Sequence, residues 1–91
     1  MFTIKVVGHD NAMEIFEAAR VVISRKVDSG NYMVFMQVSD PDDAGRRGLI
    51  ERHVYAADNA PDGEQRARYV VVENGAGETS QVFRCDSMMA R

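Results

Sequence analysis

Residues 21–38 read VVISRKVDSGNYMVFMQV, and their pattern sets the fold class expected for the whole chain. The stretch begins with the β-prone run Val21–Val27 and ends with a second one, Tyr32–Val38. The four residues between these runs, Asp28-Ser29-Gly30-Asn31, are of types that favour tight turns. Two β-prone runs joined by so short a polar segment predict a β-hairpin.

Similar short apolar runs, each bounded by polar turns, occur along the rest of the chain. Phe2–Val7 alternates apolar and polar residues with a period of two, which predicts a half-buried strand. Leu49–Tyr55 predicts another strand. A terminal hairpin is expected from Tyr69–Val72 and Gln81–Cys85, because the Asn74-Gly75 dipeptide between them is a favoured hairpin turn.

Residues 11–20 leave two interpretations open. As a helix, this segment has Asn11 in position to cap it and places Ile15 and Phe16 on one apolar stripe. As a strand, Met13–Ala18 returns as the hairpin partner of the first strand. The helix would be barely two turns long, and isolated helices that short are marginal. The pattern therefore favours a strand, with one short helix near residues 11–20 as the alternative.

Together these patterns predict a single mostly-β domain over residues 1–91. The expected architecture is a small antiparallel sandwich or barrel-like sheet of about six or seven strands. The length of 91 residues and the apolar content of 45% fit one folded domain with a modest core.

Charge and hydropathy narrow the classes of partner. The formal net charge is −3, so the chain lacks the positive field of a typical nucleic-acid binder, and direct nucleic-acid binding is not expected. No stretch approaches the roughly 20 apolar residues that cross a bilayer, so no membrane association is expected. The first residues lack the pattern of a secretory signal. We therefore expect a cytoplasmic protein.

Catalytic and metal-binding patterns are weak. Cys85 is the single cysteine, which rules out an internal disulfide, and it ends an apolar run that predicts a core position. The two histidines, His9 and His53, do not have the spacing of a metal-binding pair. No nucleophile–base pair stands out. We therefore expect a protein that is not an enzyme, with no cofactor and no metal site.

The segment Asp40–Glu51 supports an alternative function, small-ligand or metal-ion binding. Asp40, Asp42 and Glu51 match positions 1, 3 and 12 of a calcium-binding loop. Ala44 stands at position 5, where the template requires an oxygen donor, and Glu51 is expected on a strand. We therefore expect no tight calcium site, and an acidic turn is the simpler interpretation.

Two long polar loops carry the candidate contact residues for a protein partner, because loops on a rigid scaffold are common binding sites. If the loops share one end of the fold, their arginines and aspartates form a patch of mixed charge that suits a protein. The predicted partner-binding residues are Asp40, Asp42, Asp43, Arg46, Arg47, Arg66 and Arg68.

A second interface is predicted at the run Val70-Val71-Val72. This run has apolar side chains on both faces, whereas a half-buried strand needs only one apolar face. Either a second sheet or a second copy of the chain must cover the other face. A symmetric homodimer that buries Val70, Val71 and Val72 is the prediction, since two-fold dimers are the commonest oligomers.

The first strand with Glu14-Ile15-Phe16-Glu17-Ala18, and Tyr69–Gly75 with its return strand, resemble short β-rich accessory proteins of phages and prophages. The resemblance is one of pattern, covers about a third of the chain, and transfers no functional residue. It implies a small non-catalytic protein that acts on a larger host or viral assembly in the host cytoplasm. Inhibitors of bacterial defence complexes are one such type.

Overall fold

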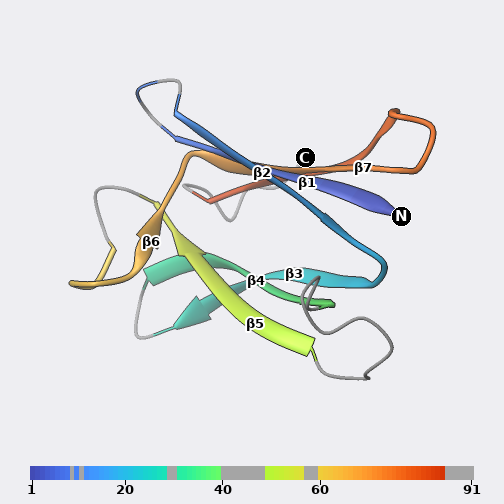
Figure 1. The fold of residues 1–91 in the computed structure, drawn as a ribbon. Coiled ribbons are helices and arrows are strands. Elements are labelled where there is room, and N and C mark those ends of the chain that lie inside the picture. The colour runs from blue at the N-terminus through green and yellow to red at the C-terminus, as the bar shows by residue number, and fades with distance from the viewer. Residues whose placement is uncertain (9, 11, 29–30, 40–48, 57–59, 86–91) are drawn as a thin grey trace.

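Over the residues that it describes, a computed structural model of the chain shows an all-β fold with eight strands in two sheets of four strands each. Figure 1 shows the sheets as two layers, with β1, β2 and β7 in one layer and β3, β4 and β5 in the other. The structure describes residues 1–8, 10, 12–28, 31–39, 49–56 and 60–85.

The first sheet, called sheet A, has the strand order β2-β1-β7-β8, and every neighbouring pair in it is antiparallel. The first two strands of the chain and the last two therefore lie in one sheet, because β1 pairs with both β2 and β7. The bounds of its strands are β1 Phe2–Val7, β2 Met13–Ala18, β7 Tyr69–Glu73 and β8 Thr79–Arg84.

The second sheet, sheet B, has the order β3-β4-β5-β6. Its first three strands pair antiparallel, whereas β6 pairs parallel to β5. The bounds of its strands are β3 Val21–Asp28, β4 Asn31–Ser39, β5 Leu49–Tyr55 and β6 Gln65–Arg66.

The predicted mostly-β fold is confirmed, and the architecture is an open two-sheet arrangement rather than a closed barrel. Met13–Ala18 forms strand β2, so the short-helix alternative was wrong. The reason is its long ladder with β1, which runs from Phe2 opposite Ala18 to Val7 opposite Met13. The strand β6 was not predicted, because it has two residues, too few to show a period in the sequence.

The core lies between the two sheets. Sheet A contributes Ile4 and Val70, and sheet B contributes Val34 and Met36, all with no exposed surface. Each such side chain stabilises the fold by about 1.5–3 kcal/mol relative to an exposed position. Cys85 belongs to the same cluster, as its place at the end of an apolar run predicts.

The β7–β8 turn uses a different glycine from the one that the sequence indicates. The side-chain oxygen of Asn74 accepts hydrogen bonds from the backbone N–H groups of Ala76 and Glu78. Gly77, rather than Gly75, has the positive φ of 81°. A residue without a Cβ adopts that conformation at little cost, so Gly77 is the conformationally required residue of this turn.

A side chain of sheet B holds the connection between β2 and β3. Ser39, at the end of β4, accepts hydrogen bonds at Oγ from the backbone N–H of Ala19 (2.8 Å) and of Arg20 (3.3 Å). The N–H of Ser39 in turn donates to the carbonyl of Arg20 at 3.1 Å. This cluster fixes the point where the chain passes from sheet A to sheet B.

Candidate protein-interaction surface

Of the predicted partner-binding residues in the two long polar loops, the structure describes Arg66 and Arg68. Arg66 lies on β6 and Arg68 follows it, and both residues are exposed. The backbone of Arg68 bridges two strands, since its N–H donates to Val7 (2.7 Å) and its carbonyl accepts from Cys85 (2.9 Å). The other predicted partner-binding residues lie outside the described residues: Asp40, Asp42, Asp43, Arg46 and Arg47. Of the alternative Asp40–Glu51 site, Glu51 is described, and it lies exposed on strand β5 as expected.

The run Val70-Val71-Val72 does not form an interface as a unit. Val70 and Val72 are 0% and 2% exposed within this single chain, because sheet B covers that face of β7. Only Val71 turns to the opposite face, where it is half-buried. Of these three residues a second copy therefore has access to Val71 alone, and the homodimer itself stays a prediction.

The face of sheet A that turns away from sheet B, here called the outer face of sheet A, carries Val71 in an apolar band. Directly opposite residues of antiparallel strands share a face of the sheet. The register therefore aligns Ile15 on β2, Lys5 on β1, Val71 on β7 and Val82 on β8 in one row across the sheet.

A second row lies beside the first. It consists of Met13, Val7, Tyr69 and Arg84, again one residue from each strand. Three apolar side chains of these two rows are well exposed: Met13 is 51%, Ile15 is 58% and Val82 is 50% exposed. The two rows thus present apolar side chains from all four strands to solvent.

An ion pair lies within this apolar band. Lys5 Nζ is 2.8 Å from Glu73 Oε2, and the two side chains are 31% and 18% exposed. Lys5 has Ile15 and Val71 as its cross-strand neighbours, so its methylene stem continues the apolar row while its charge is held by Glu73. The band therefore contains no unpaired charge at its centre.

Exposed apolar residues of sheet B are arranged differently. Val22 lies on the outer face of that sheet, Ile50 lies at the start of β5, and Val27 lies opposite Tyr32 near the end of the β3–β4 ladder. Scattered apolar residues of this kind are normal on protein surfaces, whereas a contiguous patch marks an interaction site. Among the described residues, the outer face of sheet A differs in that its exposed apolar residues lie on paired strands in two neighbouring rows.

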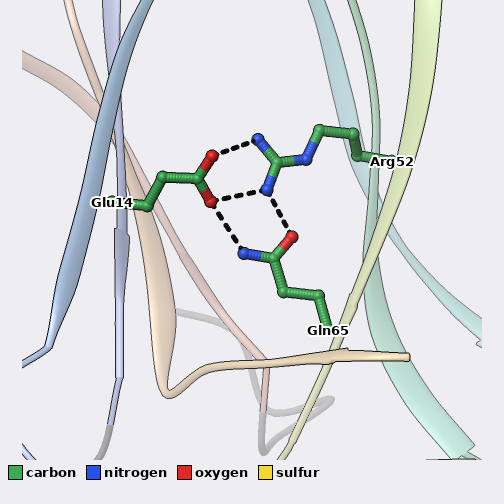
Figure 2. A network of polar contacts seen from close by, with 3 residues as sticks. All are labelled: Glu14, Arg52 and Gln65. Atoms are coloured by element: carbon green, nitrogen blue, oxygen red, sulfur yellow. Dashed lines mark hydrogen bonds and ion pairs between the residues drawn. The ribbon is translucent and has the colours of Figure 1, made fainter. Parts of the chain in front are cut away.

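A polar network lies at a different place, where β2 approaches β5 and β6 (Figure 2). Arg52 donates Nη1–H to Glu14 Oε2 (3.0 Å) and Nη2–H to Glu14 Oε1 (2.6 Å). Gln65 completes the network, because its Nε2 donates to Glu14 Oε1 at 2.9 Å and its Oε1 accepts from Arg52. The Arg52 guanidinium also lies 4.8 Å from the centre of the Phe16 ring.

This network joins the two sheets. Glu14 and Phe16 belong to sheet A, whereas Arg52 and Gln65 belong to sheet B. The hydrogen bonds from Arg52 lower the pKa of Glu14 below its ordinary value of 4.5, Gln65 and the Arg52 charge add to this, and partial burial opposes it. The carboxylate of Glu14, the guanidinium of Arg52 and the amide of Gln65 each contact the other two groups, so we interpret the network as a structural clamp.

A pocket of about 260 Å³ lies next to this clamp, between β6 and the start of β2. Its lining includes Met13, Glu14, Gln65 and Arg66. The carboxylate and the amide of this lining are already engaged with Arg52. The pocket therefore offers few polar groups for orienting a small ligand.

Two kinds of feature are absent from the described part of the chain. It contains no group of three or more His, Cys, Asp or Glu side chains placed to hold a metal ion. Within the same residues, no helix has the length and apolar character needed to span a membrane. Comparison of the chain with protein-family models, curated proteins and solved structures found no match.

The local patterns of the sequence did not reveal either the outer face of sheet A or the clamp. The apolar band joins residues from four strands, and Glu14 and Arg52 are 38 positions apart. One signal was present, since Met13 and Ile15 alternate with Glu14 on β2 and so place two large apolar side chains opposite a charged one. The register with β1 decided which of these faces points outward.

Proposed function

We propose that this protein is a non-catalytic protein-binding module that contacts its partner through the outer face of sheet A. The observation that carries the proposal is the apolar band with Met13, Ile15 and Val82 at half exposure or more. Burying such side chains against a partner removes apolar area from water, which is the main favourable term in protein association. The ion pair at the centre of the band and Arg84 at its edge supply the polar contacts that orient a partner.

The resemblance to phage and prophage accessory proteins supplies the biological setting of this proposal. In that setting the module acts in the cytoplasm of a host cell, as an inhibitor or accessory factor of a larger host complex such as a bacterial defence complex. The acidic net charge of −3 is consistent with a protein partner rather than a nucleic acid.

The test compares two apolar side chains of equal exposure on different faces. Ile15 is 58% exposed on the outer face of sheet A, and Val22 is 57% exposed on the outer face of sheet B. Tagged wild type, Ile15→Lys and Val22→Lys are incubated with bacterial lysate, and the captured proteins are quantified by mass spectrometry. A specific partner is then expressed, and its affinity for all three proteins is measured by calorimetry.

We expect Ile15→Lys to lose the partner and Val22→Lys to keep it. An unpaired charge buried against an apolar partner surface costs several kcal/mol, so the loss of affinity is about a hundredfold or more. Circular dichroism checks that both variants fold. Equal affinity of all three proteins for the partner, or loss of binding by Val22→Lys alone, contradicts the proposal.

A further inference from the structure

The second row of the outer face of sheet A carries basic residues at its β7–β8 end. Tyr69 belongs to this row, and Arg84 lies directly opposite it on β8. The guanidinium carbon of Arg68 lies 6.0 Å from the centre of the Tyr69 ring. Both arginines are exposed, whereas the tyrosine is half-buried. Two exposed arginines are therefore neighbours of one aromatic side chain on this face.

A third arginine lies at the β2 end of the same row. Arg66 on β6 lines the pocket that Met13 also lines, and Met13 is the β2 member of the row. From β6 the chain passes to β7 beside the β1–β2 turn (Figure 1), where the N–H of Arg68 donates to the carbonyl of Val7 at 2.7 Å. The three residues Arg66, Arg68 and Arg84, here called the basic border, thus follow the second row from β2 to β8.

Glu14 and Asp10, two acidic residues near the basic border, have other contacts. Glu14 is bound within the clamp, and Asp10 accepts a backbone N–H in the β1–β2 turn. No ion pair joins Arg66 or Arg68 to a carboxylate of the described residues. Arg84 has an interaction within its own chain, and the five N–H donors of its guanidinium allow a further carboxylate contact.

The opposite border of the outer face carries the opposite charge. On the other side of the first apolar row, Thr3 lies between Glu17 of β2 and Glu73 of β7. Glu17 is exposed, and Glu73 holds the charge of Lys5. The outer face is therefore polarised along its strands, with two apolar rows between a basic border and an acidic one.

We propose that the partner contacts this face with a protein segment whose apolar side chains are bordered on one side by carboxylates, and that these carboxylates bind the basic border. This rests on the proposed function and adds the chemistry and the orientation of the partner. Arginine forms two-point contacts with carboxylates, and Arg and Tyr are enriched among the residues that dominate binding energy at interfaces. In the reversed orientation the carboxylates face Glu17 and are repelled, so the charges select one direction.

A protein carboxylate fits this face better than the phosphates of a nucleic acid. The basic border adjoins two apolar rows, which the apolar side chains of a protein segment can cover. The net charge of −3 opposes the approach of a polyanion. On the described strands of sheet A, Tyr69 is the one aromatic residue of the outer face, whereas single-strand binders stack successive bases on several rings.

A displayed library of random peptides tests the chemistry of the partner. Peptides are selected separately on the wild type, Arg68→Glu and Arg20→Glu, and are then sequenced. Arg20 is the matched control, because it is exposed and follows the Ala18 end of β2, whereas the basic border lies at the Met13 end. We expect the wild type and the control to select apolar residues together with Asp and Glu, and Arg68→Glu to lose the enrichment of Asp and Glu.

Calorimetry then measures the affinity of the most enriched peptide for these three proteins and for Ile15→Lys. We expect Arg68→Glu to bind about tenfold more weakly than the wild type, because an attractive contact becomes a repulsive one. Arg20→Glu should bind like the wild type, and Ile15→Lys should lose the peptide. Circular dichroism checks that each variant folds.

The outcomes separate this inference from the proposed function. Loss of binding by Ile15→Lys, with equal affinity of Arg68→Glu and Arg20→Glu, keeps the binding face and overturns the acidic segment. Binding that is indifferent to Ile15→Lys overturns the face itself. Enrichment of Lys and Arg on the wild type, or of no peptide, overturns the inference. So does binding of a labelled single-stranded DNA that Arg68→Glu weakens, because phosphate is then the ligand.

Discussion

Arg52 on β5 and Glu14 on β2 form a two-point ion pair that connects the two sheets of the fold, with N–O distances of 3.0 and 2.6 Å. The Arg52 side chain is 22% exposed and that of Glu14 is 47% exposed. The pair is therefore neither a solvated surface contact nor a buried one. Its surroundings, the Phe16 ring on one side and the Gln65 amide on the other, determine how much it stabilises the fold.

Replacing the arginine tests the clamp. We expect Arg52→Met to lower the free energy of unfolding by about 1 kcal/mol, because it removes a two-point ion pair and a cation–π contact at a partly exposed site. Urea denaturation measures this change. The control is Arg66→Met, which removes an exposed arginine from the neighbouring strand β6. Equal stability of the two variants contradicts the assignment of Arg52 as a clamp.

Acidification tests the carboxylate of the same pair. The pKa of Glu14 is lowered in the folded state, so its stabilising contribution is present above the ordinary value of 4.5 and is lost as the pH falls through the lower folded-state pKa. The wild type is therefore expected to exceed Glu14→Gln in stability at neutral pH, and this difference should shrink below pH 4.5. Urea denaturation at several pH values measures it.

The control for this pH dependence comes from the same strand. Glu17→Gln removes a carboxylate from the outer face of β2, opposite Thr3. We expect its stability difference from the wild type to change less with pH than that of Glu14→Gln. Parallel pH profiles of the two variants argue against a special role for Glu14.

Two isoleucines on neighbouring strands test the assignment of the inner and outer faces. Ile4 on β1 is fully buried, whereas Ile15 on β2 is 58% exposed. We expect Ile4→Ala to destabilise the protein by about 2–5 kcal/mol, because it leaves a cavity between the sheets. Ile15→Ala should change the stability by less than about 0.5 kcal/mol. Thermal or urea unfolding of both variants checks this, and similar losses contradict the assigned faces.

Two glycines of the β7–β8 connection provide a matched test of the turn. Gly77 has a φ of 81°, and a Cβ there meets no other atom within 4 Å, so steric strain in the backbone is the whole effect. We expect Gly77→Ala to cost about 1 kcal/mol. A Cβ at Gly75 has ordinary contact distances of 3.4 Å or more to Met1, so Gly75→Ala should be nearly neutral. Unfolding experiments that rank the two in the reverse order contradict this turn geometry.

Local pattern was enough to predict most of the strands. The runs around residues 21–38 form the antiparallel strands β3 and β4, and Leu49–Tyr55 forms β5 with the predicted bounds. Alternation in Phe2–Val7 and β propensity in Tyr69–Val72 likewise gave β1 and most of β7. These predictions succeed because strand formation and turn chemistry depend on residues close together in sequence.

The sequence by itself therefore determined an all-β domain and the positions of most of its strands, whereas the tertiary structure decided which faces and edges are exposed. Val70 and Val71 are adjacent and chemically identical, yet one lies in the core and the other on the outer face. Glu14 and Arg52 meet only because β2 lies opposite β5. Burial and pairing of this kind depend on contacts between strands distant in the chain, and no local period of the sequence contains that information.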